Sequence, residues 1–152
     1  MLAAHAALDD YDFLLGSGDP ARWAEYVERR QQWALGRNLP PGWVPTTFLI
    51  AIVDDEIVGR SSIRHELNEF LATLGGHIGY TVLPRHRRRG YATEILRQSL
   101  VVARSLGIDR VLVTCDGDNA PSARVIEKCG GIFEGSVDDR SSGTRKLRYW
   151  ID

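Results

Sequence analysis

The residue types that bind a phosphate lie close together in the stretch RRRGYA at 87–92. This stretch follows an apolar, strand-like run over 78–82 and opens an amphipathic helix that begins near Tyr91. The first N–H groups of a helix have no partner inside it, and the helix dipole favours an anion there. Gly90 leaves room for a phosphate to approach the main chain, and arginines add charge-assisted hydrogen bonds. The pattern predicts a site for a phosphorylated ligand.

A basic run also occurs in solvated turns and in nucleic-acid-binding patches, and the composition of the chain bears on the second of these alternatives. The chain has 19 Lys and Arg residues against 20 Asp and Glu residues, with a net charge of -1. A nucleic-acid-binding domain usually has a strongly basic balance. We therefore expect no nucleic-acid partner, and the solvated turn stays open as the alternative to a phosphate site.

The composition is that of an ordinary globular protein, and 152 residues predict a single domain over 1–152. No apolar run approaches the ~20 residues of a membrane span, so we expect no membrane partner. The segment 1–8 lacks a basic leader, which disfavours a signal peptide. Two cysteines, Cys115 and Cys129, make no disulfide framework and favour a cytoplasmic location. No set of His, Cys, Asp and Glu has metal-ligand spacing, so we expect no metal.

The elements that position the basic stretch follow from periodicity and turn signals. A helix over 20–35 is predicted from the cap-like pair Asp19-Pro20, with Trp23, Val27 and Ala34 on its inward stripe. The further predictions are strands over 47–53, 57–64, 77–82, 110–115, 132–137 and 144–151, helices over 91–106 and 119–129, and a mixed segment over 65–76. The strand–helix–strand unit over 77–115 predicts a right-handed parallel crossover if its strands are adjacent. The fold class is α/β (α+β), a mixed sheet with helices on both faces.

Two motifs resemble the GNAT superfamily of acetyl-CoA-dependent N-acetyltransferases. The stretch at 87–92 is similar to its pyrophosphate loop, Arg/Gln-x-x-Gly-x-Gly/Ala, and the stretch DNAPSARVIEKCGG at 118–131 is similar to its second motif. Segments 42–47, 64–69, 75–80 and 148–151 resemble a bacterial subgroup of acetyltransferases without an assigned substrate. The resemblance covers most of the chain. It implies a mostly antiparallel central sheet of the GNAT type.

The resemblance also implies how acetyl-CoA binds. Main-chain groups of the central strand pair with the pantetheine arm, which requires that strand and the next to splay apart, and main-chain N–H groups over 88–93 hold the pyrophosphate. Asn119 contacts pantetheine, and Ser122 reaches polar groups of the ligand. The implied binding residues are Tyr80, Thr81, Val82, Arg87, Arg88, Arg89, Gly90, Tyr91, Ala92, Thr93, Asn119 and Ser122. For Asn119 a plain helix cap is the alternative, and for Lys128 a solvated helix end is favoured over ligand contact.

The implied reaction is direct acyl transfer, in which a neutral amine attacks the thioester. A base must first deprotonate the amine. Glu66, His65 and His77 are the candidate bases, although each has a plain structural explanation as an exposed charge or a local hydrogen-bonding group. The family's tyrosine acid is replaced by Ile126, so Tyr149 or Tyr80 is the candidate acid.

The remaining expectations concern the acceptor and partners. Trp43, in a proline-rich loop, is a candidate wall of the acceptor pocket, and Asn68 either orients a substrate or caps a turn. Cys115 is expected to be a small buried residue and not a covalent nucleophile. The expected acceptor is a small-molecule amine. A protein or peptide amine and a non-catalytic acyl-CoA sensor are the alternatives, and exposed strand edges make a homodimer possible.

Overall fold

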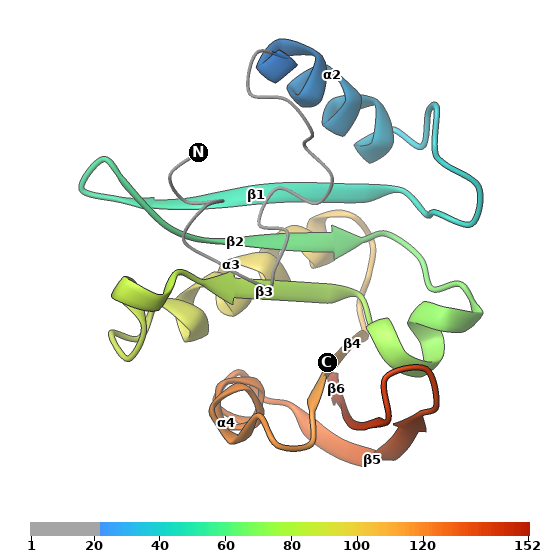
Figure 1. The fold of residues 1–152 in the computed structure, drawn as a ribbon, viewed down its shortest axis with the longest axis vertical. Coiled ribbons are helices and arrows are strands. Elements are labelled where there is room, and N and C mark those ends of the chain that lie inside the picture. The colour runs from blue at the N-terminus through green and yellow to red at the C-terminus, as the bar shows by residue number, and fades with distance from the viewer. Residues whose placement is uncertain (1–21) are drawn as a thin grey trace.

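The computed structural model describes residues 22–152 as two small sheets with helices packed against them (Figure 1). The elements are α2 (Trp23–Ala34), β1 (Thr46–Val53), β2 (Glu56–Arg64), a π-helical turn (Leu71–Gly75), β3 (Ile78–Val82), a 3-10 turn (Pro84–His86), α3 (Tyr91–Ser105), β4 (Val111–Asp116), α4 (Ala120–Lys128), β5 (Ile132–Asp139) and β6 (Thr144–Ile151). The sheets have the orders β1-β2-β3 and β4-β6-β5, and every pairing within them is antiparallel. The predicted α/β fold class with mostly antiparallel strands is confirmed.

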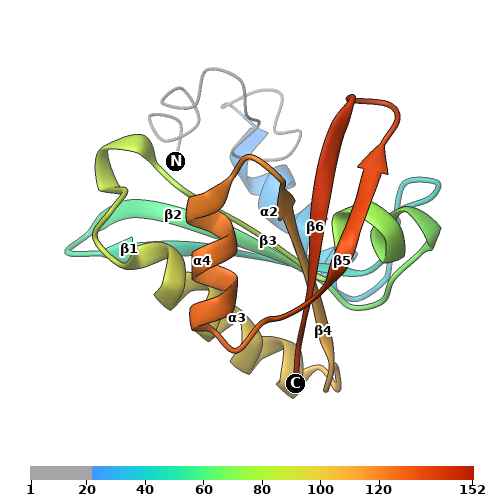
Figure 2. The ribbon, with the colours of Figure 1, turned by 90° about the horizontal axis from the view of Figure 1, so that it is seen from below.

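Helices cover both faces of the first sheet. Figure 2 shows α2 and α3 on opposite sides of β1, β2 and β3. On one face the ring of Tyr26 meets the edge of Phe48 in β1, with 6.5 Å between the ring centroids. On the other face α3 buries Ile95, Leu96, Ser99, Leu100 and Ala103. The buried side of α3 fits the amphipathic helix predicted from the sequence, and Leu106, just beyond the end of α3, is 41% exposed.

The predicted inward stripe of α2 is correct only in part. Val27 packs against Tyr26 and Leu83, as predicted, whereas Trp23 is 38% exposed. The buried residues of this helix are Tyr26, Arg30 and Trp33. The guanidinium of Arg30 lies 4.9 Å from the ring centroid of Tyr26 and 4.7 Å from that of Trp33. Cation–π contacts of this kind bury an arginine that an apolar pattern assigns to the surface. The predicted cap at Asp19-Pro20 lies outside the described residues.

Strands β3 and β4 do not form the continuous parallel pair that the crossover suggested. They join at one point, where the His77 N–H donates to the Leu112 carbonyl at 2.7 Å and the Leu112 N–H donates to His77 Nδ1 at 2.9 Å. Beyond this His77–Leu112 junction the two strands belong to separate sheets and diverge (Figure 2). We call the facing sides of β3 and β4 beyond the junction the open edges. They correspond to the splayed strands that the resemblance implies.

The main core lies where α3, β3, β4 and α4 meet. Its most completely buried members include Ile63, Leu96, Val113 and Ile126, each 0% exposed. This core fixes the first sheet, the second sheet and both motif-bearing helices relative to one another. Within residues 22–152 no helix is long and apolar enough to cross a membrane.

Candidate functional site

The loop between β3 and α3 presents unpaired main-chain N–H groups. Gly90 is the residue before the first turn of α3, with φ +84°, and no side chain caps that end of the helix. The first helical bond joins the Glu94 N–H to the Gly90 carbonyl at 3.2 Å. The N–H groups over 91–93 therefore have no partner within the helix. Arg88 also has a positive φ, 61°. This conformation turns successive N–H groups to one side, as in anion-binding nests.

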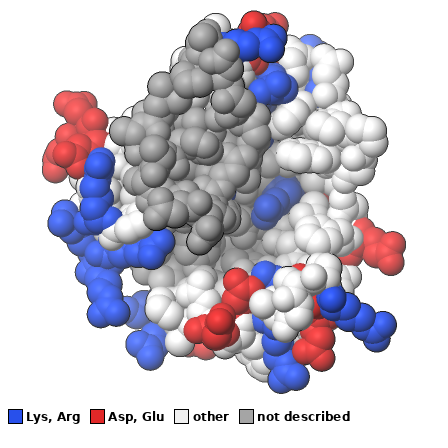
Figure 3. Space-filling view, viewed as in Figure 1, with Lys and Arg blue, Asp and Glu red and all other residues white. Residues whose placement is uncertain are grey.

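Exposed arginines surround these N–H groups. Arg85, Arg87, Arg88 and Arg89 are all exposed, and Figure 3 shows basic side chains gathered on the left edge, where this loop lies. The Arg87 Nε donates to the Val82 carbonyl at 3.2 Å, which fastens the loop to the end of β3. The predicted binding residues over 87–93 thus form one basic turn at the start of a 15-residue helix. Such a turn suits a diphosphate.

The ladder between β2 and β3 decides which residues of β3 face the open edge. The Arg64 N–H donates to the His77 carbonyl at 2.8 Å, and the Leu83 N–H donates to the Val58 carbonyl at 2.9 Å. Because hydrogen-bonded pairs alternate along an antiparallel ladder, the odd-numbered residues of β3 bond to β2. The main-chain groups of Tyr80 and Val82 therefore point toward β4. The implied main-chain contact from Thr81 needs correction, since Thr81 lies opposite Arg60 in β2.

The side chain of Tyr80 spans from β3 to α4. Its hydroxyl lies 2.8 Å from Ser122 Oγ, and burial raises the pKa of Tyr80 to about 12. The Asn119 side chain accepts a hydrogen bond from the Ser122 N–H at 3.1 Å. Asn119 is therefore the cap of α4, which was the alternative assignment, and it is exposed at the start of that helix.

The candidate bases His65 and Glu66 lie at the opposite end of β3 from the loop. Arg64, the last residue of β2, is opposite His77 at the junction, so both candidates follow the closed end of the sheet. At ~3.3 Å per residue along a strand, Arg64 at the end of β2 lies roughly 10 Å along the ladder from Ser61, the residue opposite Tyr80, and Glu66 follows two residues later. His65 Nε2 lies 2.8 Å from Thr47 Oγ1, and desolvation lowers its pKa although Glu66 opposes the shift. Glu66 itself is exposed.

Two neighbours of these candidates have defined structural roles. Asn68 donates to the Gly42 carbonyl at 2.9 Å and accepts from the Leu71 N–H at 2.9 Å, so it caps the π-helical turn. Trp43 is 47% exposed, with its ring centroid 5.0 Å from that of Trp33. The proline-rich loop is therefore fastened to α2 and to the turn that follows β2. The roles predicted for Trp43 and Asn68 at an acceptor remain predictions.

His77 and Tyr149 are both buried, 7% and 3% exposed. Burial, followed by the charge of Arg64, lowers the pKa of His77, and its Nδ1 is occupied by the Leu112 N–H. Tyr149 in β6 lies on the side of α4, where burial raises its pKa and Phe133 meets its ring at 5.4 Å. The structure thus brings Tyr80, and none of the three candidate bases, to the open edges.

Cys115 is buried at the end of β4. Burial and the neighbouring Asp116 raise the pKa of the Cys115 thiol to about 11. A thiol with such a pKa stays protonated at neutral pH and is a poor nucleophile. This fits the expectation that Cys115 forms no covalent acyl intermediate. Among the described residues no group of three or more His, Cys, Asp and Glu is arranged to hold a metal ion.

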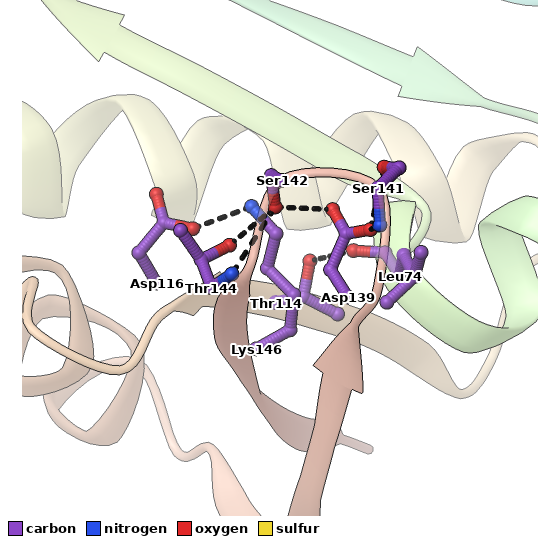
Figure 4. A network of polar contacts seen from close by, with 8 residues as sticks. All are labelled: Leu74, Thr114, Asp116, Asp139, Ser141, Ser142, Thr144 and Lys146. Carbon is purple, nitrogen blue, oxygen red and sulfur yellow. Dashed lines mark hydrogen bonds and ion pairs between the residues drawn. The ribbon is translucent and has the colours of Figure 1, made fainter.

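One charged pair near the open edges escaped the sequence analysis. Asp116 Oδ1 lies 2.5 Å from Lys146 Nζ, directly across the β4–β6 ladder. Figure 4 shows this pair beside the β5–β6 turn, where Asp139 is hydrogen-bonded to Ser141 and Ser142. Since Val113 and Cys115 point into the core, Asp116 points to the opposite face. Only the position of Asp116 at the end of a strand signalled it in the sequence.

A separate pocket lies between β1 and α3. A cavity of about 330 Å³ is formed between β1 and the first half of α3. Its walls include Leu49, Ile52, Glu94 and Gln98. It reaches the basic loop only through Tyr91, so it is separate from the open edges.

The chain is similar to known acetyltransferases in sequence and in fold. The acetyltransferase (GNAT) domain family matches residues 4–132. The uncharacterized N-acetyltransferase YoaA of Bacillus subtilis (strain 168) is 31% identical over 83 residues, and the aligned part is 47% of this chain and 47% of that protein. The alignment thus spans about half of this curated relative.

Solved structures share the fold at low sequence identity. YncA from Salmonella typhimurium, solved with its cofactor acetyl-CoA, superposes with a TM-score of 0.65 at 14% identity, covering 99% of this chain and 84% of that one. The ribosomal-protein-alanine N-acetyltransferase from Brucella melitensis gives a TM-score of 0.64 at 15% identity, covering 98% and 86%. These likenesses support the fold.

Proposed function

The chain belongs to the GNAT acetyltransferase family, and we propose that it is an acetyl-CoA-dependent N-acetyltransferase acting on a primary amine of a small molecule. The observation that carries this proposal is the continuity of two binding features. A basic turn with free helix N–H groups follows directly on a strand whose edge is open at Tyr80 and Val82. A diphosphate and an extended amide chain, joined as in coenzyme A, fit this order.

Bound acetyl-CoA supplies a thioester carbon that a neutral amine attacks, with the CoA thiol as leaving group. The N–H groups over 91–93 and the arginines hold the diphosphate, and the edges of Tyr80 and Val82 orient the pantetheine amides. A main-chain N–H of the open edge near Val82 is the donor that we assign to the thioester oxygen as it becomes negative. The Tyr80 hydroxyl, protonated at neutral pH, donates a hydrogen bond to the departing sulfur.

For the base, we infer that Asp116 is better placed than Glu66. Asp116 lies four residues beyond Leu112 along β4, and Tyr80 lies three residues beyond His77 along β3. Both residues are therefore about 10–13 Å from the junction on its open side, by the rise of a strand. A carboxylate at this position can bind the ammonium group of an acceptor, and in the absence of an acceptor Asp116 is paired with Lys146. The same carboxylate can accept the proton of the amine directly or through water. Glu66, His65 and His77 remain the candidate bases predicted from the sequence.

Two alternatives keep the same fold. In the first, the acceptor is a protein or peptide amine. In the second, the domain binds acyl-CoA without turnover, which the buried Ile126 at the position of the family's tyrosine favours. Tyr80 supplies a hydroxyl on the same side of the sheet as α4, and this supports an enzyme.

Thiol release tests the proposal and both alternatives. The protein is incubated with acetyl-CoA and separate panels of polyamines, aminoglycosides, amino acids and peptides. Release with small amines supports the proposed activity, whereas release only with peptides favours the protein-modifying alternative. Binding of acetyl-CoA in calorimetry without release from any acceptor favours the sensor. Absence of binding contradicts all three.

A further inference from the structure

We propose that His77 is a positioning residue that ends the pairing of β3 with β4 and thereby sets the opening that receives coenzyme A. The inference rests on the proposed function for the identity of the ligand, and on the structure for the junction itself. His77 forms hydrogen bonds with both the main-chain carbonyl and the main-chain N–H of Leu112, which belongs to the other sheet. Its N–H donates to the Leu112 carbonyl at 2.7 Å, and its Nδ1 accepts the Leu112 N–H at 2.9 Å.

The imidazole takes the place of a main-chain partner. In a parallel ladder, a residue bonds through its N–H and its carbonyl to main-chain groups on either side of its neighbour. Here the Leu112 N–H is satisfied by the imidazole. The His77 carbonyl, which a continued ladder would offer to the Thr114 N–H, accepts from the Arg64 N–H of β2 at 2.8 Å, so the ladder stops at its first rung. The strands are held together at one end without being drawn together along their length.

The residues around His77 allow the close contact with Leu112 and hold it in place. Gly76 has φ +66°, and a Cβ at that position would lie 2.7 Å from the Leu112 carbonyl oxygen. The Gly76 N–H donates to the Leu71 carbonyl at 2.7 Å, which fixes the approach from the π-helical turn. Two residues along β4, the Thr114 hydroxyl donates to Leu74 in the same turn at 2.7 Å. The turn therefore holds both strands at the junction.

Burial fixes the state of the imidazole. His77 is 7% exposed, and the ring of Trp150 lies 6.5 Å away in an edge-on arrangement. Because Nδ1 accepts a hydrogen bond, the ring is neutral with its proton on Nε2. A buried polar ring is retained at such a place only when its hydrogen bond is made, and loss of that bond leaves the Leu112 N–H unsatisfied.

The test compares His77→Asn, which keeps an acceptor near the Nδ1 position, with His77→Phe, which keeps the ring and removes the acceptor. The probe is coenzyme A, and its affinity is measured by calorimetry. We expect His77→Phe to lose at least about tenfold in affinity and His77→Asn to stay within about threefold of the parent. Ile151→Val, a buried change in β6 opposite Val111 that leaves the His77–Leu112 hydrogen bonds in place, controls for destabilisation alone.

A ligand-free measurement separates this inference from the proposed function. Amide hydrogen exchange by NMR should accelerate at Leu112 in His77→Phe and stay unchanged at Val113, whose main-chain groups pair with β6. If the parent protein binds no coenzyme A, the proposed function fails, and the exchange pattern alone decides whether His77 holds the junction. Unchanged exchange at Leu112, or unchanged affinity in a folded His77→Phe, overturns the inference.

If His77→Phe does not fold, Gly76→Ala replaces it in both measurements. That variant places a Cβ against the Leu112 carbonyl and strains the same junction without altering the imidazole. We expect faster exchange at Leu112 and weaker binding of coenzyme A. Parent-like exchange and affinity in Gly76→Ala contradict the inference equally.

Discussion

The hydroxyl of Tyr80 and the hydroxyl of Ser122 lie 2.8 Å apart, joining the open edge of β3 to the first turn of α4. No sequence pattern links these two residues, which are 42 positions apart. The contact brings an aromatic hydroxyl to the side of α4, the helix in which the family's tyrosine is replaced by Ile126. The chain thus presents a protonated phenol from a strand where a relative would present one from a helix.

The first prediction concerns this phenol. Tyr80→Phe should lower kcat about 10–100-fold while the KM for acetyl-CoA stays within about twofold, because the lost donor acts on the leaving sulfur. Tyr149→Phe is the matched control, a hydroxyl deletion from another buried tyrosine in β6. It should affect stability more than turnover. Equal loss of kcat in both variants, measured by thiol release, would show that Tyr80 has no special role.

The second prediction separates ligand binding from backbone strain at two glycines. Gly90 and Gly107 have φ +84° and +82°, and a Cβ at either would meet nothing within 4 Å. Glutamate at either position should cost about 1 kcal/mol of stability through the left-handed conformation. Only Gly90→Glu should abolish binding of coenzyme A, because it adds a negative charge beside the N–H groups over 91–93. Calorimetry on the pair checks this, and equal affinities would remove the pyrophosphate from this loop.

The third prediction asks whether main chain or side chain holds the diphosphate. Arg88 has φ 61°, which glycine adopts without strain. Arg88→Gly should therefore raise the free energy of unfolding by about 0.5–1 kcal/mol. If main-chain N–H groups supply most of the contact, affinity for coenzyme A should fall less than about tenfold. A loss as large as that of Gly90→Glu would assign the binding to the guanidinium instead.

The fourth prediction is a pH dependence of stability. Burial lowers the pKa of His77 and of His65 below the unfolded value of 6.5. Below pH 6.5 the unfolded chain binds protons that the folded protein resists, so stability falls as pH drops from about 7 to 5.5 and changes little between about pH 7 and pH 8. Glu94, Glu134 and Asp139, whose pKa values are lowered, titrate at still lower pH.

Urea unfolding at pH 8 and pH 5.5 measures this dependence. The folded forms of His77→Asn and His65→Asn should each show a smaller difference in the free energy of unfolding between the two pH values than the parent. Arg64 lies beside His77 and Glu66 beside His65, so the larger share of the difference belongs to His77. If neither substitution changes the difference in the free energy of unfolding between pH 8 and pH 5.5, the attribution of this difference to His77 and His65 is contradicted.

The fifth prediction compares two carboxylates. Asp116→Asn should lower kcat/KM for the acceptor by about 100-fold or more, the usual loss when a general base is removed. Glu66→Gln should change it less than about threefold, because Glu66 lies beyond the closed end of the sheet. Both variants should bind coenzyme A as the parent does. The opposite ranking in steady-state assays with the accepted amine would restore Glu66 as the base.

Local patterns predicted most of the fold. The strand over 144–151 and the start of α3 at Tyr91 appear where periodicity and turn residues put them. The inward face of α2 was predicted only in part, because Arg30 is buried by aromatic rings that come from two elements. Long-range packing of this kind leaves no trace in a local apolar pattern.

The candidate site divides in the same way. The basic turn was predictable because the loop and the helix start are adjacent in sequence. The separation of Glu66 from Tyr80, and the role of His77 at Leu112, depend on strand register and on the point where two sheets part. These are tertiary properties, so the sequence could not identify the base among Glu66, His65 and His77, which the fold sets apart.

A crystal structure with bound acetyl-CoA tests the central claim most directly. The account predicts diphosphate oxygens within hydrogen-bonding distance of the N–H groups over 88–93, and pantetheine amides paired with the main chain of Tyr80 and Val82. A diphosphate bound elsewhere, or a pantetheine arm outside the open edges of β3 and β4, would contradict it.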